Sequence, residues 1–143
     1  MFLGEYTYKI DDKKRLAVPQ KFRATLGKKA VITMGLDNCL FLFPLKDWGV
    51  FAKKLAQMPL GQSDARGFAR MMLAGAMEVS LDGLGRILMP DYLKNSCKIT
   101  KEVVIAGLYN RIEIWDKAIW QDYKIQTAKE VGNIAERLKE LGV

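Results

Sequence analysis

Polar and apolar positions alternate at the start of the chain, which is the pattern of a half-buried β-strand. Over residues 5–10 two tyrosines and an isoleucine share one face, and polar side chains occupy the other. Residues 11–14 are polar and predict a turn, after which 15–18 resume a strand. Pro19 suits the first turn of a short helix, and Gly27 suits its end.

The same periodicities predict elements along the rest of the chain. Strands are expected over 31–34, 39–43, 77–81 and 86–89, and a hairpin over 103–115. Helices are expected over 45–57, over 63–76 with Ser63 as a possible cap, near Asp91, and after the hairpin. Apolar residues at helical spacing near the end predict an amphipathic terminal helix: Val131, Ile134, Leu138 and Leu141.

The chain also repeats itself, which is stronger information than any single element. An Asp-x-x-x-Arg turn followed by a proline occurs twice, 71 residues apart. One residue later in register, a glycine, an asparagine and a tryptophan recur as well. The matched positions are Asp11 and Asp82, Arg15 and Arg86, Pro19 and Pro90, Gly35 and Gly107, Asn38 and Asn110, and Trp48 and Trp120.

One repeat of about 45 residues is too small for a stable core of its own. Two copies packed together remove this difficulty, so we expect one pseudo-twofold unit of the α+β class, rich in β-structure. The expected parts are repeat 1 at 5–47, connecting helices at 48–75, repeat 2 at 76–119, and a C-terminal helical segment at 120–143.

Composition excludes several chemistries. The 143 residues contain no histidine and only two cysteines, so His-dependent triads and the common zinc sites are ruled out. We expect no metal, no cofactor and no small-molecule substrate. Cys39 and Cys97 are expected to be small buried hydrophobic residues. Two isolated cysteines also fit a protein of a reducing compartment better than a disulfide framework. The sequence shows neither the pattern of a signal peptide nor a long apolar segment, so no membrane partner is expected.

Charge is distributed unevenly. The formal net charge is +7, and the whole surplus lies in residues 1–71, which hold 13 basic and 6 acidic residues, whereas 72–143 hold 10 of each. An asymmetry of this kind indicates an interaction surface for a polyanion such as DNA or RNA.

The paired motifs resemble the MraZ family of bacterial transcriptional regulators. The resemblance rests on the two turns, Asp11 to Arg15 and Asp82 to Arg86, with their following prolines. It also rests on the segments 1–4, 35–40 and 112–116, and it covers nearly the whole chain. The family usually has glycine before the motif arginine. Gly85 keeps this pattern, whereas position 14 is a lysine, which is costly if the site demands a positive φ.

The resemblance implies two SpoVT-AbrB-like swapped-hairpin domains in a double-ψ or β-barrel-like unit, with flanking helices, assembled into ring-shaped homo-oligomers. It also implies sequence-specific binding of double-stranded DNA. The target would be short direct repeats in the promoter of the division and cell-wall gene cluster, including the protein's own gene. We therefore expect a cytoplasmic, nucleoid-associated regulator.

The turn residues divide into two roles. A guanidinium held across a tight turn has the fixed planar fork that recognises guanine or phosphate, so Arg15 and Arg86 are the candidate DNA contacts, with a purely structural ion pair as the alternative. Asp11 and Asp82 are interpreted as structural turn partners, because carboxylates repel phosphate. Further candidate phosphate contacts, each with a solvated side chain as the alternative, are Lys9, Lys13, Lys14, Lys21 and Arg23.

The residues offer three alternative classes of function. An enzyme is disfavoured, because no nucleophile has a visible base. An RNA-binding module predicts exposed aromatic residues on a sheet, whereas Tyr6, Tyr8 and the tryptophans fit core positions. A protein-interaction scaffold would use the charge-balanced second half and the terminal helix.

Overall fold

The computed structural model describes all residues, 1–143, as an α+β fold with a π-helical turn, η1, and a short 3-10 helix, η2. The strands are β1 (Phe2–Lys9), β2 (Arg15–Ala17), β3 (Lys29–Met34), β4 (Leu40–Pro44), β5 (Met77–Ser80), β6 (Arg86–Leu88), β7 (Glu102–Tyr109) and β8 (Ile112–Asp116). The helices are α1 (Gln20–Leu26), α2 (Leu45–Ala56), α3 (Ser63–Ala69), η1 (Arg70–Ala74), α4 (Asp91–Ser96), α5 (Lys117–Arg137) and η2 (Lys139–Leu141).

Strands of the two repeats interleave in the main sheet. The six strands lie in the order β1-β7-β8-β4-β3-β5, and every pair is antiparallel. The first strand of repeat 1 therefore lies beside β7 of repeat 2, and the first strand of repeat 2 lies beside β3 of repeat 1. The predicted α+β class with two repeats is confirmed, and the repeats share one sheet.

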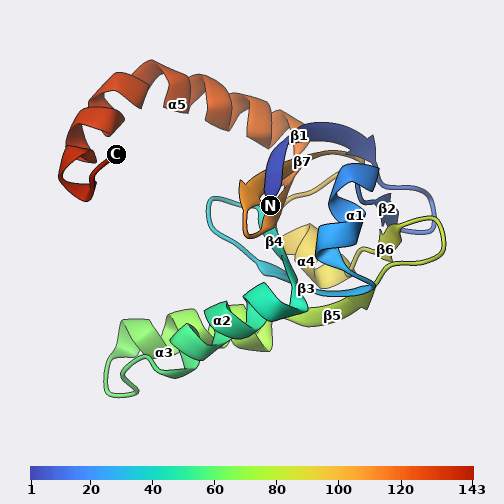
Figure 1. Cartoon of the computed structure of the whole chain (residues 1–143), viewed down its shortest axis with the longest axis horizontal. Helices are drawn as coiled ribbons and strands as arrows, with labels where there is room; N and C mark the ends of the chain where they lie inside the picture. Colours follow the sequence, from blue (N-terminus) through green and yellow to red (C-terminus); the bar gives the residue numbers. More distant parts are fainter.

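A second, two-stranded ribbon joins the repeats again. β2 pairs with β6 antiparallel, with Leu16 opposite Ile87, and both side chains are buried. The two turns that precede these strands, β1–β2 and β5–β6, consequently lie together at one end of the molecule, on the right of Figure 1.

The central strands β4 and β8 are buried on both faces of the sheet, whereas the edge strands β1 and β5 are largely exposed. Successive side chains of a strand point to opposite sides, so each central strand contributes to two cores. Along β4, Leu40 and Leu42 join a large core that also includes residues of β2, β6, α1 and α4. Phe41 and Phe43 face the other way and pack against residues of α2, η1 and β8. Every residue of β4 is buried as a result.

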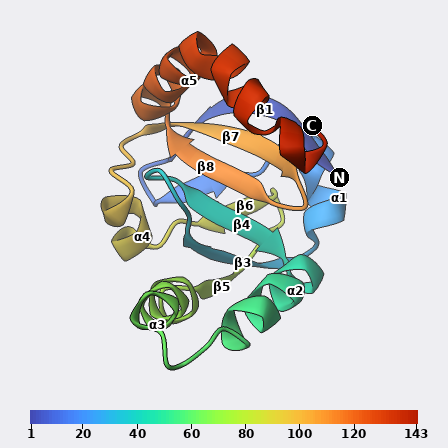
Figure 2. The same cartoon turned by 90° about the vertical axis from the view of Figure 1, so that its left-hand side faces the viewer.

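Two helical arms extend from the second face of the sheet. α2, α3 and η1 form the lower arm in Figure 1, and α5 forms the upper arm, so that the molecule opens on the side opposite the two turns. Turned by 90°, the face of the sheet is visible between the arms (Figure 2). No helix combines the length and apolar character that crossing a membrane requires.

Several sequence predictions are confirmed residue by residue. Phe22 and Leu26 of α1 are buried, and Gly27 ends the helix with a φ of 83°. Cys39 and Cys97 are buried free thiols, and burial raises the pKa of both. Tyr6 packs edge-on against Phe22, which fits a core position better than a stacking platform.

The predicted helix over 63–76 was wrong in two respects. The α-helical part ends at Ala69 and continues as the π-helical turn η1, where Thr33 of β3 donates its hydroxyl to the Met72 carbonyl. Ser63 is the first helical residue and makes no capping hydrogen bond. Contacts between this segment and the sheet therefore override the simple 3.6-residue period.

Candidate nucleic-acid interface

Each Asp-x-x-x-Arg turn is organised by its aspartate. Asp11 Oδ1 accepts hydrogen bonds from the backbone N–H groups of Lys13 and Arg15, both at 2.9 Å, and its Oδ2 accepts from Arg15 Nε at 2.9 Å. The Asp11 N–H donates to the Arg15 carbonyl and the Lys14 N–H donates to the Asp11 carbonyl, which closes the turn. The carboxylate thus shapes the loop and aims the guanidinium.

The second turn repeats this arrangement atom for atom. Asp82 Oδ1 accepts from the N–H groups of Leu84 and Arg86 at 3.0 and 2.9 Å, and Oδ2 accepts from Arg86 Nε at 2.8 Å. In both turns the donated backbone bond from the arginine is the largest cause that lowers the pKa of the aspartate. The carboxylates are therefore charged at neutral pH, and each faces inward to its own turn.

Both arginines keep donors available for a ligand. The turn carboxylate occupies only the Nε of Arg15 and of Arg86, which leaves the terminal Nη groups of each fork without a hydrogen-bond partner in the protein. Their side chains are 31% and 26% exposed. A guanidinium in this state is oriented by the protein and still able to donate two parallel hydrogen bonds outward.

A left-handed backbone conformation precedes each arginine. Lys14 has a φ of 63°, and Gly85, its counterpart in repeat 2, has a φ of 73°. The site therefore demands a positive φ, and Lys14 pays a conformational cost that glycine avoids. Instead of projecting freely, Lys14 Nζ contacts Asp91 Oδ2 of α4 at 2.6 Å.

The second turn is held across the repeats by different chemistry. The Arg23 side chain lies directly over Gly85, where any Cβ would meet its guanidinium, and Arg23 Nε donates to the Val18 carbonyl at 2.9 Å. The Val18 N–H in turn donates to the Gly85 carbonyl. Arg23 consequently lies against the second turn, and its phosphate contact stays a prediction.

Replacing Lys14 by glycine is expected to increase the unfolding free energy by up to about 1 kcal/mol. Relief of the left-handed strain contributes about 1–2 kcal/mol, and the loss of the exposed ion pair with Asp91 costs less than about 1 kcal/mol. Urea denaturation measures the change. Lys14→Ala is the matched variant, because it loses the ion pair and retains the strain, so it should be less stable than Lys14→Gly. Equal stabilities would contradict this account.

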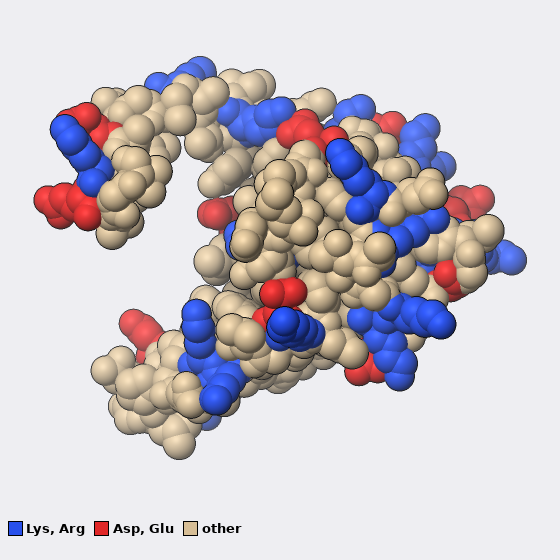
Figure 3. Space-filling view, viewed as in Figure 1, with Lys and Arg blue, Asp and Glu red and all other residues tan.

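The remaining candidate cations are placed differently from one another. Lys13 and Lys14 lie on the first turn beside Arg15, whereas Lys9 precedes it on β1 with its Nζ 3.9 Å from Glu102 Oε1. Lys21 is exposed on α1. Figure 3 shows basic side chains over the turn end, with acidic ones between them.

Cations of the opposite repeat border each turn, and the sequence reasoning missed two of them. Lys94 and Lys101 of repeat 2 line a hollow of about 270 Å³ beside Asp11 and Lys14. Arg23 and Lys28 of repeat 1 line the corresponding hollow beside the second turn. Lys94 is 71 residues after Arg23 in the sequence, so the repeat itself was the signal that could have identified it.

Comparisons with known proteins agree with this paired arrangement. A family model described as "MraZ protein, putative antitoxin-like" matches the chain twice, over residues 1–71 and over 72–141. Proteins named "Transcriptional regulator MraZ" are similar along all 143 residues and along their own full length. Those from Moorella thermoacetica, Natranaerobius thermophilus and Caldanaerobacter subterraneus subsp. tengcongensis are 43%, 44% and 44% identical to this chain.

Proposed function

The chain belongs to the MraZ family of transcriptional regulators, and we propose that it binds double-stranded DNA in a sequence-specific manner through its two Asp-Arg turns. The single observation that supports this most is the pair of guanidinium groups, each fixed through Nε and open at Nη. Such a fork matches the O6 and N7 acceptors of guanine or two oxygens of a phosphate. A regulator of this family is not an enzyme.

The exposed lysines supply the sequence-independent part of the affinity in this proposal. Lys13 lies on the first turn and Lys21 on α1, and neither is in an ion pair with an acidic residue of the protein. Lys94 and Lys101 add positive charge from the second repeat beside the same turn. Phosphate contacts of this kind set register and orientation, and the arginines read the bases.

The targets that we propose are short tandem repeats in the promoter of the division and cell-wall gene cluster, including the promoter of the protein's own gene. A ring-shaped homo-oligomer would place several turn pairs on successive repeats, so that weak single contacts sum to a high affinity. The protein would accordingly act in the cytoplasm, at the nucleoid.

A gel-shift experiment on the DNA immediately upstream of the gene tests the proposed function. We expect a retarded complex with the native upstream sequence and a loss of that complex when its short direct repeats are scrambled. Single-stranded RNA of the same length should not compete. Equal binding to native and scrambled DNA would contradict sequence-specific recognition, and competition by RNA would favour an RNA-binding module.

The salt dependence of DNA binding is expected to report the number of phosphate contacts. The logarithm of the binding constant should fall with the logarithm of salt concentration by about 0.9 per neutralised phosphate. Lys21→Gln should reduce this slope by about 1 and weaken all DNA sequences alike. Lys54→Gln, on α2 in the lower arm away from the turns (Figure 1), is the control and should leave the slope unchanged. Affinity independent of salt would contradict the charge argument.

A further inference from the structure

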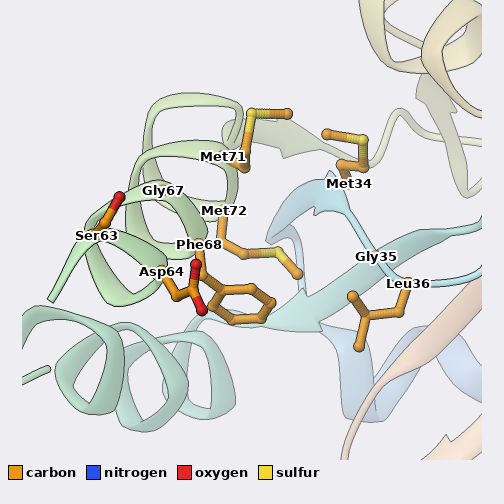
Figure 4. Close-up of a pocket in the computed structure, with 9 residues that line it drawn as sticks. All are labelled: Met34, Gly35, Leu36, Ser63, Asp64, Gly67, Phe68, Met71 and Met72. Carbon is orange, nitrogen blue, oxygen red and sulfur yellow. The ribbon is translucent and has the colours of Figure 1, made fainter.

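Apolar side chains are accessible at both ends of the molecule. On the arm side there is a hollow of about 630 Å³, in which Phe68 and Met72 of the helical side face Leu36 (Figure 4). At the opposite end, the second turn exposes Leu84 and the strand β6 exposes Leu88, by 65% and 62%. These two leucines lie on the surface that the proposed function assigns to DNA.

The register of the β2–β6 ribbon places Leu88 beside Arg15. The two residues are paired across the strands, and two positions further along Ala17 is paired with Arg86. The pair between them is buried, so these four residues share the outer face of the ribbon. Side chains directly opposite each other on one face have Cβ atoms about 5 Å apart. Leu88 therefore borders the Arg15 side chain.

A single exposed leucine is normal on a protein surface and needs no partner. Leu88 differs because of its neighbours on the outer face of the ribbon. Arg15 and Arg86 each use Nε for a turn aspartate and keep their terminal Nη groups open. A face of this kind fits a ligand that presents hydrogen-bond acceptors and an apolar group next to each other.

The major groove of duplex DNA presents that combination. Guanine offers its O6 and N7 acceptors there, thymine offers its C5-methyl group, and the groove admits a two-stranded β-ribbon. Successive bases of a strand are about 3.4 Å apart along the axis, which is similar to the separation of paired residues across the ribbon. When Arg15 donates to a guanine, the neighbouring base pair consequently lies within reach of Leu88.

We infer that Leu88 is a specificity-determining residue, whose side chain packs on the C5-methyl group of a thymine next to the base that Arg15 reads. The inference rests on the proposed function and adds to it a preference for thymine, which a guanidinium fork does not supply.

The two repeats differ at this position. Leu88 corresponds to Ala17, 71 residues earlier in the sequence, and Ala17 is the residue paired with Arg86. The shorter alanine side chain buries less apolar surface against a methyl group. The thymine contact is therefore stronger beside Arg15 than beside Arg86, and the recognised sequence is expected to be asymmetric.

Removal of the thymine methyl group tests the inference. The upstream duplex is prepared once with thymine and once with deoxyuridine at every thymine position, which removes the C5-methyl group and keeps the base pairing. We expect the unaltered protein to bind the deoxyuridine duplex about fourfold more weakly, which is the effect of leaving one methyl group unburied. Leu88→Ala should bind the two duplexes equally, and its fold should persist by circular dichroism because Leu88 is exposed.

Leu60→Ala is the matched control. Leu60 is 80% exposed and lies between α2 and α3 in the lower arm (Figure 1), so this variant should distinguish the two duplexes as the unaltered protein does. Deoxyuridine also changes the shape and stiffness of DNA, and both proteins respond to that change alike. The difference in discrimination between Leu88→Ala and the unaltered protein therefore isolates the contact with the methyl group.

The outcomes separate this inference from the proposed function. Equal binding of both duplexes by the unaltered protein would overturn the inference, while preference for native over scrambled DNA would still support the proposed function. Undiminished discrimination by Leu88→Ala would also overturn it, because another residue would then contact the methyl group. Equal binding to native and scrambled DNA would contradict the proposed function and the inference together.

Discussion

Replacing Arg15 by alanine is expected to weaken binding of the upstream DNA about a hundredfold, with the fold unchanged. A bidentate contact to a base contributes about 1–3 kcal/mol of discrimination. The Arg15 guanidinium that this variant removes is oriented by two hydrogen bonds to Asp11, one from the Arg15 backbone N–H and one from its Nε. The side chain is partly exposed and outside the core, so thermal unfolding should change little. Fluorescence anisotropy with a labelled duplex at fixed salt measures the loss.

Two further variants show whether the loss comes from the planar guanidinium rather than its charge, and whether the two turns contribute equally. Arg15→Lys keeps the charge and loses the planar fork, so it should recover only a minor part of the affinity. Arg86→Ala should cost less than Arg15→Ala, because the surplus charge lies in the first repeat. Equal losses for the two alanine variants would mean that both turns face DNA alike. Full affinity of Arg15→Ala would leave the Asp-Arg pair as a structural ion pair only.

Replacing Gly107 by alanine is expected to lower the unfolding free energy by about 3 kcal/mol. Gly107 lies on β7 opposite Gly4 of β1, and an added Cβ would come within 2.5 Å of the Leu3 amide nitrogen and 2.6 Å of the Phe2 carbonyl carbon. These are backbone atoms, so relief requires β1 to move from its partner, and overpacking of this kind costs about 1–3 kcal/mol or more. Urea denaturation measures the loss.

The control for this variant is Gly49→Ala in α2, where a Cβ would meet nothing within 4 Å. Alanine is favoured over glycine inside a helix by roughly 0.5–1 kcal/mol, so this variant should be slightly more stable than the unaltered protein. A Gly107→Ala protein as stable as Gly49→Ala would mean that β1 adjusts freely, and that its pairing with β7 contributes little.

The sequence was sufficient to predict where the strands and helices lie, but it was not sufficient to predict which strands pair with each other. Alternation and helical spacing located nearly every strand and helix, because burial of one face leaves a periodic trace. The pairing of β1 with β7 and of β5 with β3 leaves no such trace. The apolar residues of β1 and of β5 would fit a partner strand within their own repeat equally well. Only the resemblance to a swapped-hairpin family anticipated the exchange.

The candidate site shows the same division. The repeat identified the two turns and their aspartates, because a motif that recurs in register can be recognised in the linear sequence alone. The contact of Lys14 with Asp91 and that of Arg23 with Gly85 cross from one repeat to the other. Such contacts depend on how the repeats pack, which the sequence does not reveal. The sequence therefore predicted both Lys14 and Arg23 as free phosphate contacts, whereas in the structure each has a partner within the protein. Their DNA contacts remain predictions.

The interleaved sheet has a consequence for synthesis of the chain. When β1 and β3 leave the ribosome, their partners β7 and β5 have not yet been translated. The paired residues are 99 positions apart for Tyr6 of β1 and Ile105 of β7, and 49 apart for Ala30 of β3 and Val79 of β5. At about 5–20 residues per second, these separations correspond to roughly 2 to 20 seconds of translation. During that interval the first half exposes unpaired apolar strand edges, which attract other chains. Completion of the second half ends this exposure, so the nascent first repeat is the stage at which chaperones would be needed most.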